Sequence, residues 1–281
     1  MKIALISDLH ANIEALKALL GEIPRHKPDL VVSLGDQVNL GPNPGETLSL
    51  MKDNGILMLR GNHERYVLSC MEGDPCYRQP NFESVRFTAG KITKDDLLLP
   101  ESWSPHPDYL FCHAMPEDDR FPVYDSEKAI PLLVDLNRST LPQHIICGHG
   151  HNPTTLMVGN HTIQSIGSSG CMDEGVPGTT NYSILQIERG ISVMQPYSIP
   201  YDTSPIRDHF ISTRMARECP IVSHIICLQM MNNHDYLIPF VRRAISLSHA
   251  KGESFLSQET WEEADASFPW PDSVTTEEFW R

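Results

Sequence analysis

Residues 2–10 read KIALISDLH, in which a short apolar run ends in two polar residues, Asp8 and His10. A continuous apolar run bounded by a polar turn is typical of a strand that is buried on both faces. The arrangement recurs, because apolar runs also lead into Gly35-Asp36, Gly61-Asn62-His63-Glu64, His113 and the sequence ICGHGH at residues 146–151. The sequence therefore predicts several buried strands with polar residues at their ends.

The first part of the chain predicts a parallel sheet. Strands are expected at residues 2–7, 30–34 and 56–59, with helices between them, the first capped by Asn12 and the second over residues 46–54. Strands that alternate with helices favour parallel pairing and right-handed crossovers. Ligands of such sheets bind at the carboxyl ends of the strands, which is where the polar clusters fall.

The rest of the chain predicts a second group of strands and then a helical tail. Helical patterns cover residues 64–71, 82–99 and 126–137, and apolar strands are expected at 109–113 and just before the ICGHGH sequence. Short β-rich runs follow, separated by turns such as Gly159-Asn160 and Arg189-Gly190, and they predict antiparallel hairpins. After Pro200, helices are expected over residues 206–218, 236–249 and 258–267, and the last of these segments is acidic.

Length, charge and cysteine usage limit the class of protein. A chain of 281 residues can form one large domain or a domain with an appendage. A net charge of -14 argues against broad binding to polymeric nucleic acid or to an anionic membrane. Seven scattered cysteines without a Cys-x-x-Cys pair indicate reduced thiols. No signal-peptide core and no membrane-spanning run is present in the sequence, so we expect a cytoplasmic protein.

Each polar cluster has a structural explanation when it is considered alone. Asp8 could cap a turn, Asn62 could cap a helix, and a lone histidine after a strand is most often a core or surface residue. The joint pattern is different, because five strands each end in aspartate, asparagine or histidine, the residue types that bind divalent metals. The sequence thus favours a metal site assembled from five strand ends.

The ordered motifs ISDLHANIEAL, SLGDQVNLGPNPGE, RGNHE and ICGHGH resemble those of the calcineurin-like metallophosphoesterases, in particular the compact prokaryotic branch of that family. The sequence IGSSG at residues 166–170 resembles a late Gly-Ser-x-Gly loop of the same family, and the resemblance extends from Met1 to about Tyr197. It implies an α/β (α+β) fold, a four-layer αββα sandwich of two mixed β-sheets flanked by helices. We expect this domain at residues 1–199 and a C-terminal helical extension, packed on or near it, at residues 200–281.

The resemblance also implies a dinuclear metal centre that hydrolyses phosphate esters by in-line attack of a metal-bridging hydroxide. The first metal would be held by Asp8, His10, Asp36 and His151, and the second by Asp36, Asn62, His113 and His149. His63 would stay free of metal and protonate the leaving oxygen. The expected ions are Mn²⁺ first, with Fe or Zn²⁺ as alternatives, and the expected substrate is a phosphodiester or phosphomonoester of a small molecule or nucleotide.

Several residues near the motifs have competing interpretations. Asn12, Arg60 and Arg120 are candidate substrate contacts, although helix capping is favoured for Asn12 and pairing with a surface acid for Arg60. Ala11, which stands where the family usually has glycine, and Ala114 are expected to narrow the pocket floor. Gly150 is expected to give the backbone freedom that lets His149 and His151 point to different metals.

Two alternatives remain open at the level of the sequence. The first is a noncatalytic scaffold with a metallophosphoesterase fold, which would have no need of His63 or of both histidines of ICGHGH. The second, nuclease action on polymeric DNA, is disfavoured by the acidic balance and by the lack of a basic stretch interleaved with aromatic residues. A homo-oligomer is compatible with the sequence, and Trp261, Trp270 and Trp280 could pack the tail on the body, meet a partner chain or stack on a base.

Overall fold

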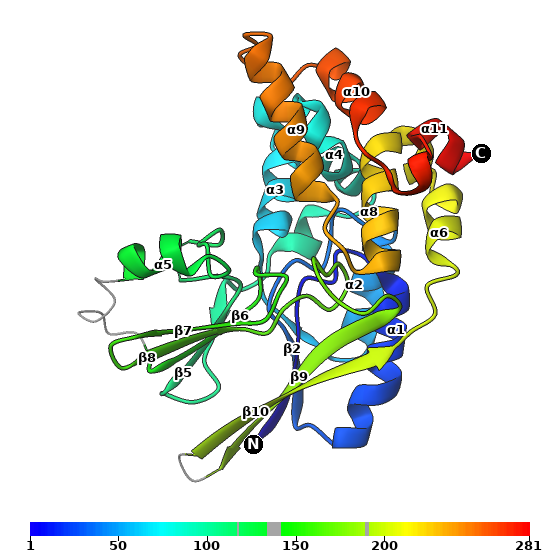
Figure 1. Ribbon diagram of the computed structural model, residues 1–281. Coiled ribbons are helices and arrows are strands. Elements are labelled where there is room, and N and C mark those ends of the chain that lie inside the picture. The colour runs from blue at the N-terminus through cyan, green and yellow to red at the C-terminus, as the bar shows by residue number, and fades with distance from the viewer. Residues whose placement is uncertain (117, 134–141, 189–190) are drawn as a thin grey trace.

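The computed structural model describes residues 1–116, 118–133, 142–188 and 191–281. Two five-stranded sheets pack against each other, and helices cover their outer faces (Figure 1). The expected α/β sandwich with helices on both sides is therefore confirmed. Among the described residues, no helix is both long enough and apolar enough to span a membrane.

The first sheet has the strand order β10-β9-β1-β2-β3. The predicted parallel pairing is present between β1 (Lys2–Ile6) and β2 (Leu30–Ser33) and between β2 and β3 (Leu57–Met58). Antiparallel strands β9 (Thr179–Glu188) and β10 (Ile191–Pro200) extend the sheet beyond β1. The predicted Arg189-Gly190 turn between them lies outside the described residues. The helices of this half are α1 (Ile13–Glu22), α2 (Pro44–Asp53), α3 (Asn62–Met71) and α4 (Glu83–Ala89).

Strand β1 explains why residues 3–6 are apolar without interruption. Ile3 and Leu5 belong to the core between the two sheets, together with Phe111 from the second sheet. Ala4 and Ile6 point to the opposite face and pack in the core that includes helix α1. Because successive side chains of a strand alternate between faces, a strand buried on both sides must be apolar throughout.

The second sheet has the strand order β4-β5-β6-β8-β7. Strands β5 (Tyr109–Cys112), β6 (His144–Cys147) and β8 (His161–Ser165) are parallel, whereas β4 (Ser102–Trp103) and β7 (Thr154–Val158) are antiparallel edges. Helix α5 (Ser126–Leu133) covers the outer face through Ala129. The predicted continuation of this helix to residue 137 lies outside the described residues.

Short 3₁₀ helices connect several of these elements. Their bounds are Ile23–His26, Pro75–Arg78, Pro80–Phe82, Lys94–Leu97 and Pro271–Ser273. They correct the helical pattern predicted over residues 82–99, because α4 ends before Gly90 and only a 3₁₀ turn follows it.

The C-terminal region is helical, as predicted, but two of its details differ. Its helices are α6 (Ile206–Ser212), α7 (Met215–Glu218), α8 (Pro220–Asn232), α9 (Leu237–Ala250), α10 (Gln258–Ser267) and α11 (Thr276–Trp280). The helix expected over residues 206–218 is broken at Arg214, which has a left-handed backbone with φ of 69°. The sequence does not indicate helix α8, because its residues are apolar on all sides and so lack a helical period.

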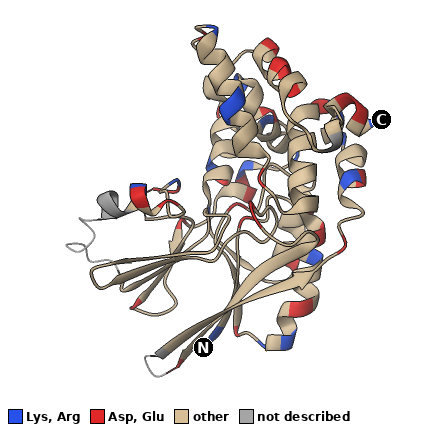
Figure 2. Cartoon of the chain, in the orientation of Figure 1, with Lys and Arg blue, Asp and Glu red and all other residues tan. Residues whose placement is uncertain are grey.

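These helices share a core of their own and pack on the α3–α4 side of the molecule (Figure 1). Trp261 and Trp270 are buried in that core, so they pack the tail and are not exposed for stacking on a base. Acidic residues gather on α10 and α11, away from the two sheets (Figure 2). The acidic segment is thus a solvated helical surface, as the charge pattern predicted.

Candidate metal centre

Asp8, His10 and His151 form the first cluster, at the carboxyl ends of β1 and β6. His151 Nε2 lies 3.2 Å from His10 Nε2 and 3.7 Å from Asp8 Oδ1. Asp8 Oδ2 accepts hydrogen bonds from Ser7 Oγ at 2.5 Å and from the His149 backbone N–H at 3.1 Å. Asp8 Oδ1 is buried without a hydrogen-bond partner among the described residues. An unpartnered carboxylate oxygen beside two imidazole nitrogens fits a divalent cation.

Asp36, His113 and His149 form the second cluster, at the ends of β2, β5 and β6. His113 Nε2 lies 3.2 Å from Asp36 Oδ2 and 2.8 Å from Asn62 Oδ1, so Asn62 joins this cluster from the start of α3. The His113 Nδ1–H donates to the Leu34 carbonyl at 2.8 Å, which directs Nε2 toward the cluster.

Asp36 lies between the two clusters. The same Oδ2 atom that faces His113 also lies 3.9 Å from His10 Nε2. The other oxygen, Oδ1, accepts the His63 backbone N–H at 2.8 Å and is thereby fixed. One carboxylate oxygen consequently faces both clusters.

His63 lies beside Asp36, and the side chain of Asn39 contacts the other nitrogen of its ring. Its Nε2 is 3.9 Å from Asp36 Oδ2, and its Nδ1 is 2.7 Å from the side-chain amide of Asn39. The geometry also groups His63 with His10 and Asp36 as a set that could hold an ion. Asn39 was assigned no role from the sequence, since its contact depends on a left-handed backbone with φ of 68°.

Glu64 is a further residue to which the sequence assigned no role. Its buried carboxylate accepts backbone N–H groups from Asp36 at 2.9 Å, Val38 at 3.1 Å and Gly61 at 2.8 Å. It therefore ties the loop after β2 to the first turn of α3. The signal for this role was its position three residues after Gly61, which is the glutamate position of a capping box.

Left-handed backbone conformations are concentrated in the loops that carry these ligands. The non-glycine residues concerned are Asp8, His10, Ala11, Asp36, Asn39, Leu40 and His149. Each such residue costs about 1–2 kcal/mol, and strain of this kind gathers at functional sites. Ala11 has φ of 57°, which explains why glycine would be favourable at that position.

Three expectations about small residues require correction. Ala11 and Ala114 are fully buried, so they do not form the floor of an open pocket. The left-handed residue of the Gly148–His151 turn is His149 itself, with φ of 60°, whereas Gly150 has no such conformation. The glycine that this turn requires is Gly148, because a Cβ atom there would collide with the side chain of Ser7.

Two imidazoles of the site favour the protonated form in the metal-free protein. Burial lowers the pKa of His113, but the nearby Asp36 carboxylate outweighs burial and raises the pKa to about 10. Burial also opposes protonation of His151, and the hydrogen bond to Asp173 outweighs it and raises that pKa to about 9. Burial acts to raise the pKa of Asp36, yet the charges of His113 and His63 hold it well below its ordinary value.

The other two candidate histidine ligands favour the neutral form. Burial, with the charge of His113, lowers the pKa of His149 to about 3. Burial, with the charge of His63, holds the pKa of His10 well below its ordinary value. A neutral imidazole is the form that binds a metal, so these two side chains are ready to do so at neutral pH.

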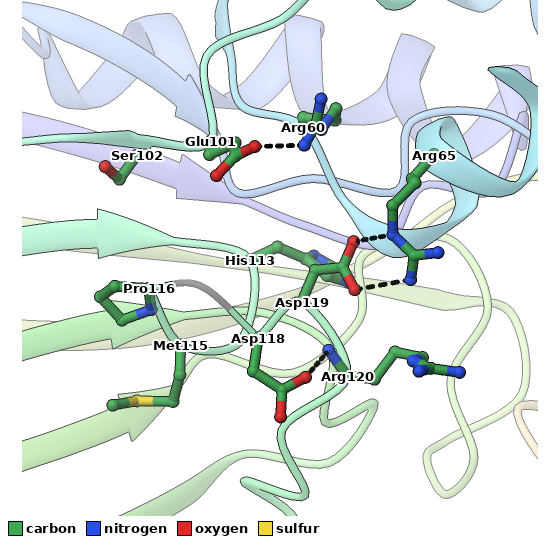
Figure 3. Close-up of a pocket in the computed structure, with 10 residues that line it drawn as sticks. All are labelled: Arg60, Arg65, Glu101, Ser102, His113, Met115, Pro116, Asp118, Asp119 and Arg120. Carbon is green, nitrogen blue, oxygen red and sulfur yellow. Dashed lines mark hydrogen bonds and ion pairs between the residues drawn. The ribbon is translucent and has the colours of Figure 1, made fainter. Parts of the chain in front are cut away.

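A cavity of about 500 Å³ opens beside His113, between residues 60–65 and the loop after β5 (Figure 3). Arg65 makes a bidentate ion pair with Asp119 at 2.6 and 2.7 Å, and Arg60 pairs with Glu101. The Arg120 guanidinium points away from the carboxylates of Asp118 and Asp119 and forms no ion pair within the described ranges (Figure 3).

The three candidate substrate contacts thus have different surroundings. Asn12 caps α1 by accepting from the Ala15 N–H, and its amide donates to Gly170 and Tyr201, so a phosphate would have to displace one of these bonds. To contact a phosphate, Arg60 would have to break its ion pair with Glu101. Arg120 needs no such exchange among the described residues, and Glu117, which adjoins this loop in the sequence, lies outside them.

Comparison with known proteins shows which family the chain is similar to. Residues 1–173 match the family model described as calcineurin-like phosphoesterase. A stretch of 160 residues is 31% identical to an uncharacterised protein of Methanocaldococcus jannaschii. That match covers 54% of this chain and 63% of the relative, so the chain spans less than two thirds of the relative's length.

Two solved structures have a similar fold. A metallophosphoesterase from Sphaerobacter thermophilus has a TM-score of 0.60 at 22% identity, covering 76% of this chain and 95% of that chain. A hypothetical protein from Pyrococcus horikoshii OT3 has a TM-score of 0.63 at 15% identity, covering 83% of this chain and 99% of that chain. At these identities the likeness concerns the fold alone.

Proposed function

Because the chain belongs to the calcineurin-like phosphoesterase family, we propose that it is a dinuclear metal-dependent phosphoesterase. Its substrates are phosphodiesters or phosphomonoesters of small molecules or nucleotides. The observation that supports this proposal most strongly is the position of Asp36, whose Oδ2 faces His10 on one side and His113 on the other. A carboxylate in that position suits two ions held side by side.

In this proposal, each cluster holds one divalent ion and Asp36 contributes to both. The first ion takes Asp8, His10, Asp36 and His151, and the second takes Asp36, Asn62, His113 and His149. The unpartnered Asp8 Oδ1 and the mixed nitrogen and oxygen donors fit Mn²⁺, Fe or Zn²⁺. When bound, such a pair lowers the pKa of water and offsets the charge of the phosphoryl oxygens during in-line displacement.

His63 is the proposed proton donor to the leaving oxygen. To donate a proton without becoming an imidazolate, the His63 ring must first carry a proton on both nitrogens. The Asn39 side chain at Nδ1 can meet that form through its amide oxygen, which has no other hydrogen-bond partner among the described residues, and Nε2 faces Asp36. Burial, opposed by Asp36, lowers the pKa of His63. A proton donor of this type contributes about 10²- to 10⁴-fold to a rate.

The proposal is tested with protein that has been stripped of metal and reloaded with Mn²⁺. Hydrolysis of bis-p-nitrophenyl phosphate and of p-nitrophenyl phosphate separates diesterase from monoesterase activity, and a panel of natural phosphates then defines the substrate. If no divalent metal supports turnover of any phosphate ester, the noncatalytic scaffold becomes the better account.

The scattered, unpaired cysteines support the further proposal of a reducing, cytoplasmic location.

Metal affinity is expected to rise with pH. In the metal-free protein His113 and His151 have pKa values of about 10 and about 9, so each must lose a proton before its Nε2 binds an ion. Each site should therefore gain up to about tenfold in Mn²⁺ affinity per pH unit between roughly pH 7 and 8.5. Calorimetric titrations in buffers of different ionisation enthalpy measure both the affinity and the released protons. Affinities that do not change with pH would contradict this assignment.

Replacement of Arg120 by alanine is expected to weaken substrate binding. A guanidinium that meets a phosphate ester contributes about 1.5 kcal/mol or more, so KM should rise roughly tenfold while metal content stays the same. Arg60→Ala is the matched control, since Arg60 is already paired with Glu101 at the same cavity. The KM for the preferred ester is measured by steady-state kinetics. Equal KM values for the wild type, Arg120→Ala and Arg60→Ala would show that Arg120 does not contact the substrate.

A further inference from the structure

The aspartate that orients His151 lies just beyond the motifs. Asp173 Oδ1 accepts a hydrogen bond from His151 Nδ1 at 3.0 Å. The opposite ring nitrogen, Nε2, faces Asp8 and His10. A carboxylate bound to one imidazole nitrogen fixes the tautomer and the ring orientation, so that the other nitrogen is presented to the metal.

Asp173 is held in turn by the C-terminal helices. The side-chain amide of Gln229, on α8, donates to the same Asp173 Oδ1 at 3.1 Å. Gln229 is only 1% exposed, so its contact is part of the packed interior. A chain of two hydrogen bonds thus connects α8 to His151.

The loop that carries Asp173 is fixed by the end of α8 at further points. The Asn233 side chain donates to the carbonyls of Val176 at 2.6 Å and Thr179 at 2.9 Å. The Asp235 backbone N–H donates to the Asp173 carbonyl at 2.8 Å. The loop is therefore bound along its length by residues 229–235, which lie outside the part of the chain that matches the family model.

The side chain of Gln229 is directed at the loop that carries Asp173, because its amide also donates to the Met172 carbonyl at 3.5 Å. Its Oε1 atom is buried without a hydrogen-bond partner among the described residues, and such an atom is destabilising. Leucine would remove that cost at a similar volume. Its amide group, in contrast, has a defined use, because it adds a second donor to the carboxylate that holds His151.

We propose that Asp173 and Gln229 are positioning residues for His151, so that the C-terminal helices complete the first metal site. This inference rests on the proposed function, specifically on His151 as a metal ligand. The C-terminal helices then raise the metal affinity of the first site. The metal affinity of the second site does not depend on them.

The test uses full-length protein, stripped of metal and titrated with Mn²⁺ by calorimetry and electron paramagnetic resonance. Because His151 must lose a proton to bind metal, titrations at several pH values are used to obtain the affinity of each site for the deprotonated protein. For Asp173→Ala we expect this pH-independent affinity of the first site to fall about 10- to 100-fold, with that of the second site unchanged. Asp173→Asn, which retains an acceptor for Nδ1–H, should recover part of the loss. Gln229→Leu should shift the first site in the same direction by a smaller factor, without a lower Tm of the metal-free protein.

Matched controls are Asp208→Asn on the exposed side of α6 and Gln258→Leu at the start of α10, and both should bind two ions as the wild type does. Wild-type affinities at both sites in Asp173→Ala and Gln229→Leu would overturn the inference while leaving the proposed function intact. A wild-type protein that binds no metal would overturn both. If Asp173→Ala does not fold, Gln229→Leu alone decides, since its substitution removes a buried unpaired atom.

Discussion

Replacement of Asp36 by alanine is expected to remove both metals and to lower phosphoesterase activity by at least about 10³-fold, or about 4 kcal/mol of transition-state stabilisation. Asp36 Oδ2 is the atom that faces His10 and His113 together. Its removal takes away the negative charge that both ions would share. The measurement is metal content by elemental analysis after reloading with Mn²⁺, together with ester hydrolysis.

Two further variants separate charge from folding. Asp36→Asn keeps an oxygen that can accept the His63 backbone N–H, so it should fold with the loop in place while still losing the shared ligand. Asp53→Ala removes an exposed carboxylate at the end of α2 and should retain two equivalents. Two full equivalents of metal in Asp36→Ala would show that this residue does not bridge the ions.

The buried strands and the polar residues at their ends could be predicted because both depend on local sequence, whereas the two-sheet sandwich and the assignment of ligands were implied by the family resemblance. The apolar residues 3–6 identify a strand buried on two faces, and the structure places Ile3 and Leu5 between the sheets. Parallel strands β1 and β2 bring Asp8 and Asp36 to one edge of the first sheet. His113 joins them from the end of β5 in the second sheet, which packs against the first.

The residues that support the ligands could not be predicted, because their roles arise from contacts between distant segments. Gln229 lies on α8, which has apolar residues on all sides and therefore shows no helical period in the sequence. Asp173 follows no strand, and only the folded loop brings it to His151. Asn39 contacts His63 from a left-handed backbone conformation, which no motif in the sequence indicates.

The division of the chain into a domain at residues 1–199 and an extension at residues 200–281 stays a prediction. The C-terminal helices make extensive contacts with the preceding part of the chain. The core of the C-terminal helices includes Leu40 and Phe87 from the first half of the chain as well as Cys171. Glu83 accepts the Val222 N–H at the start of α8, and Tyr201 connects Asn12 to Met230. The extension thus contacts the loops after β1 and β2, which carry proposed metal ligands.

Replacement of His63 by alanine is expected to leave both metals bound and to lower kcat by about 10²- to 10⁴-fold, with little change in KM. In the proposed assignment His63 donates a proton and binds no ion, so its loss affects only the step in which the leaving oxygen departs. The effect should be smallest for p-nitrophenyl esters, whose leaving group needs no proton, and largest for alkyl esters. Kinetics on an ester series with leaving groups of graded pKa measure this dependence.

The same variant can also contradict the assignment, because the geometry groups His63 with His10 and Asp36 as a set that could hold an ion. If His63→Ala binds only one equivalent of metal, His63 is a ligand and another group must supply the proton. His106→Ala, which removes a partly exposed histidine beside Asp108, should match the wild type in metal content and rate. Asn39→Ala should retain both metals and lose part of the rate, since it releases Nδ1 of His63 and leaves the ring free to turn away from Asp36.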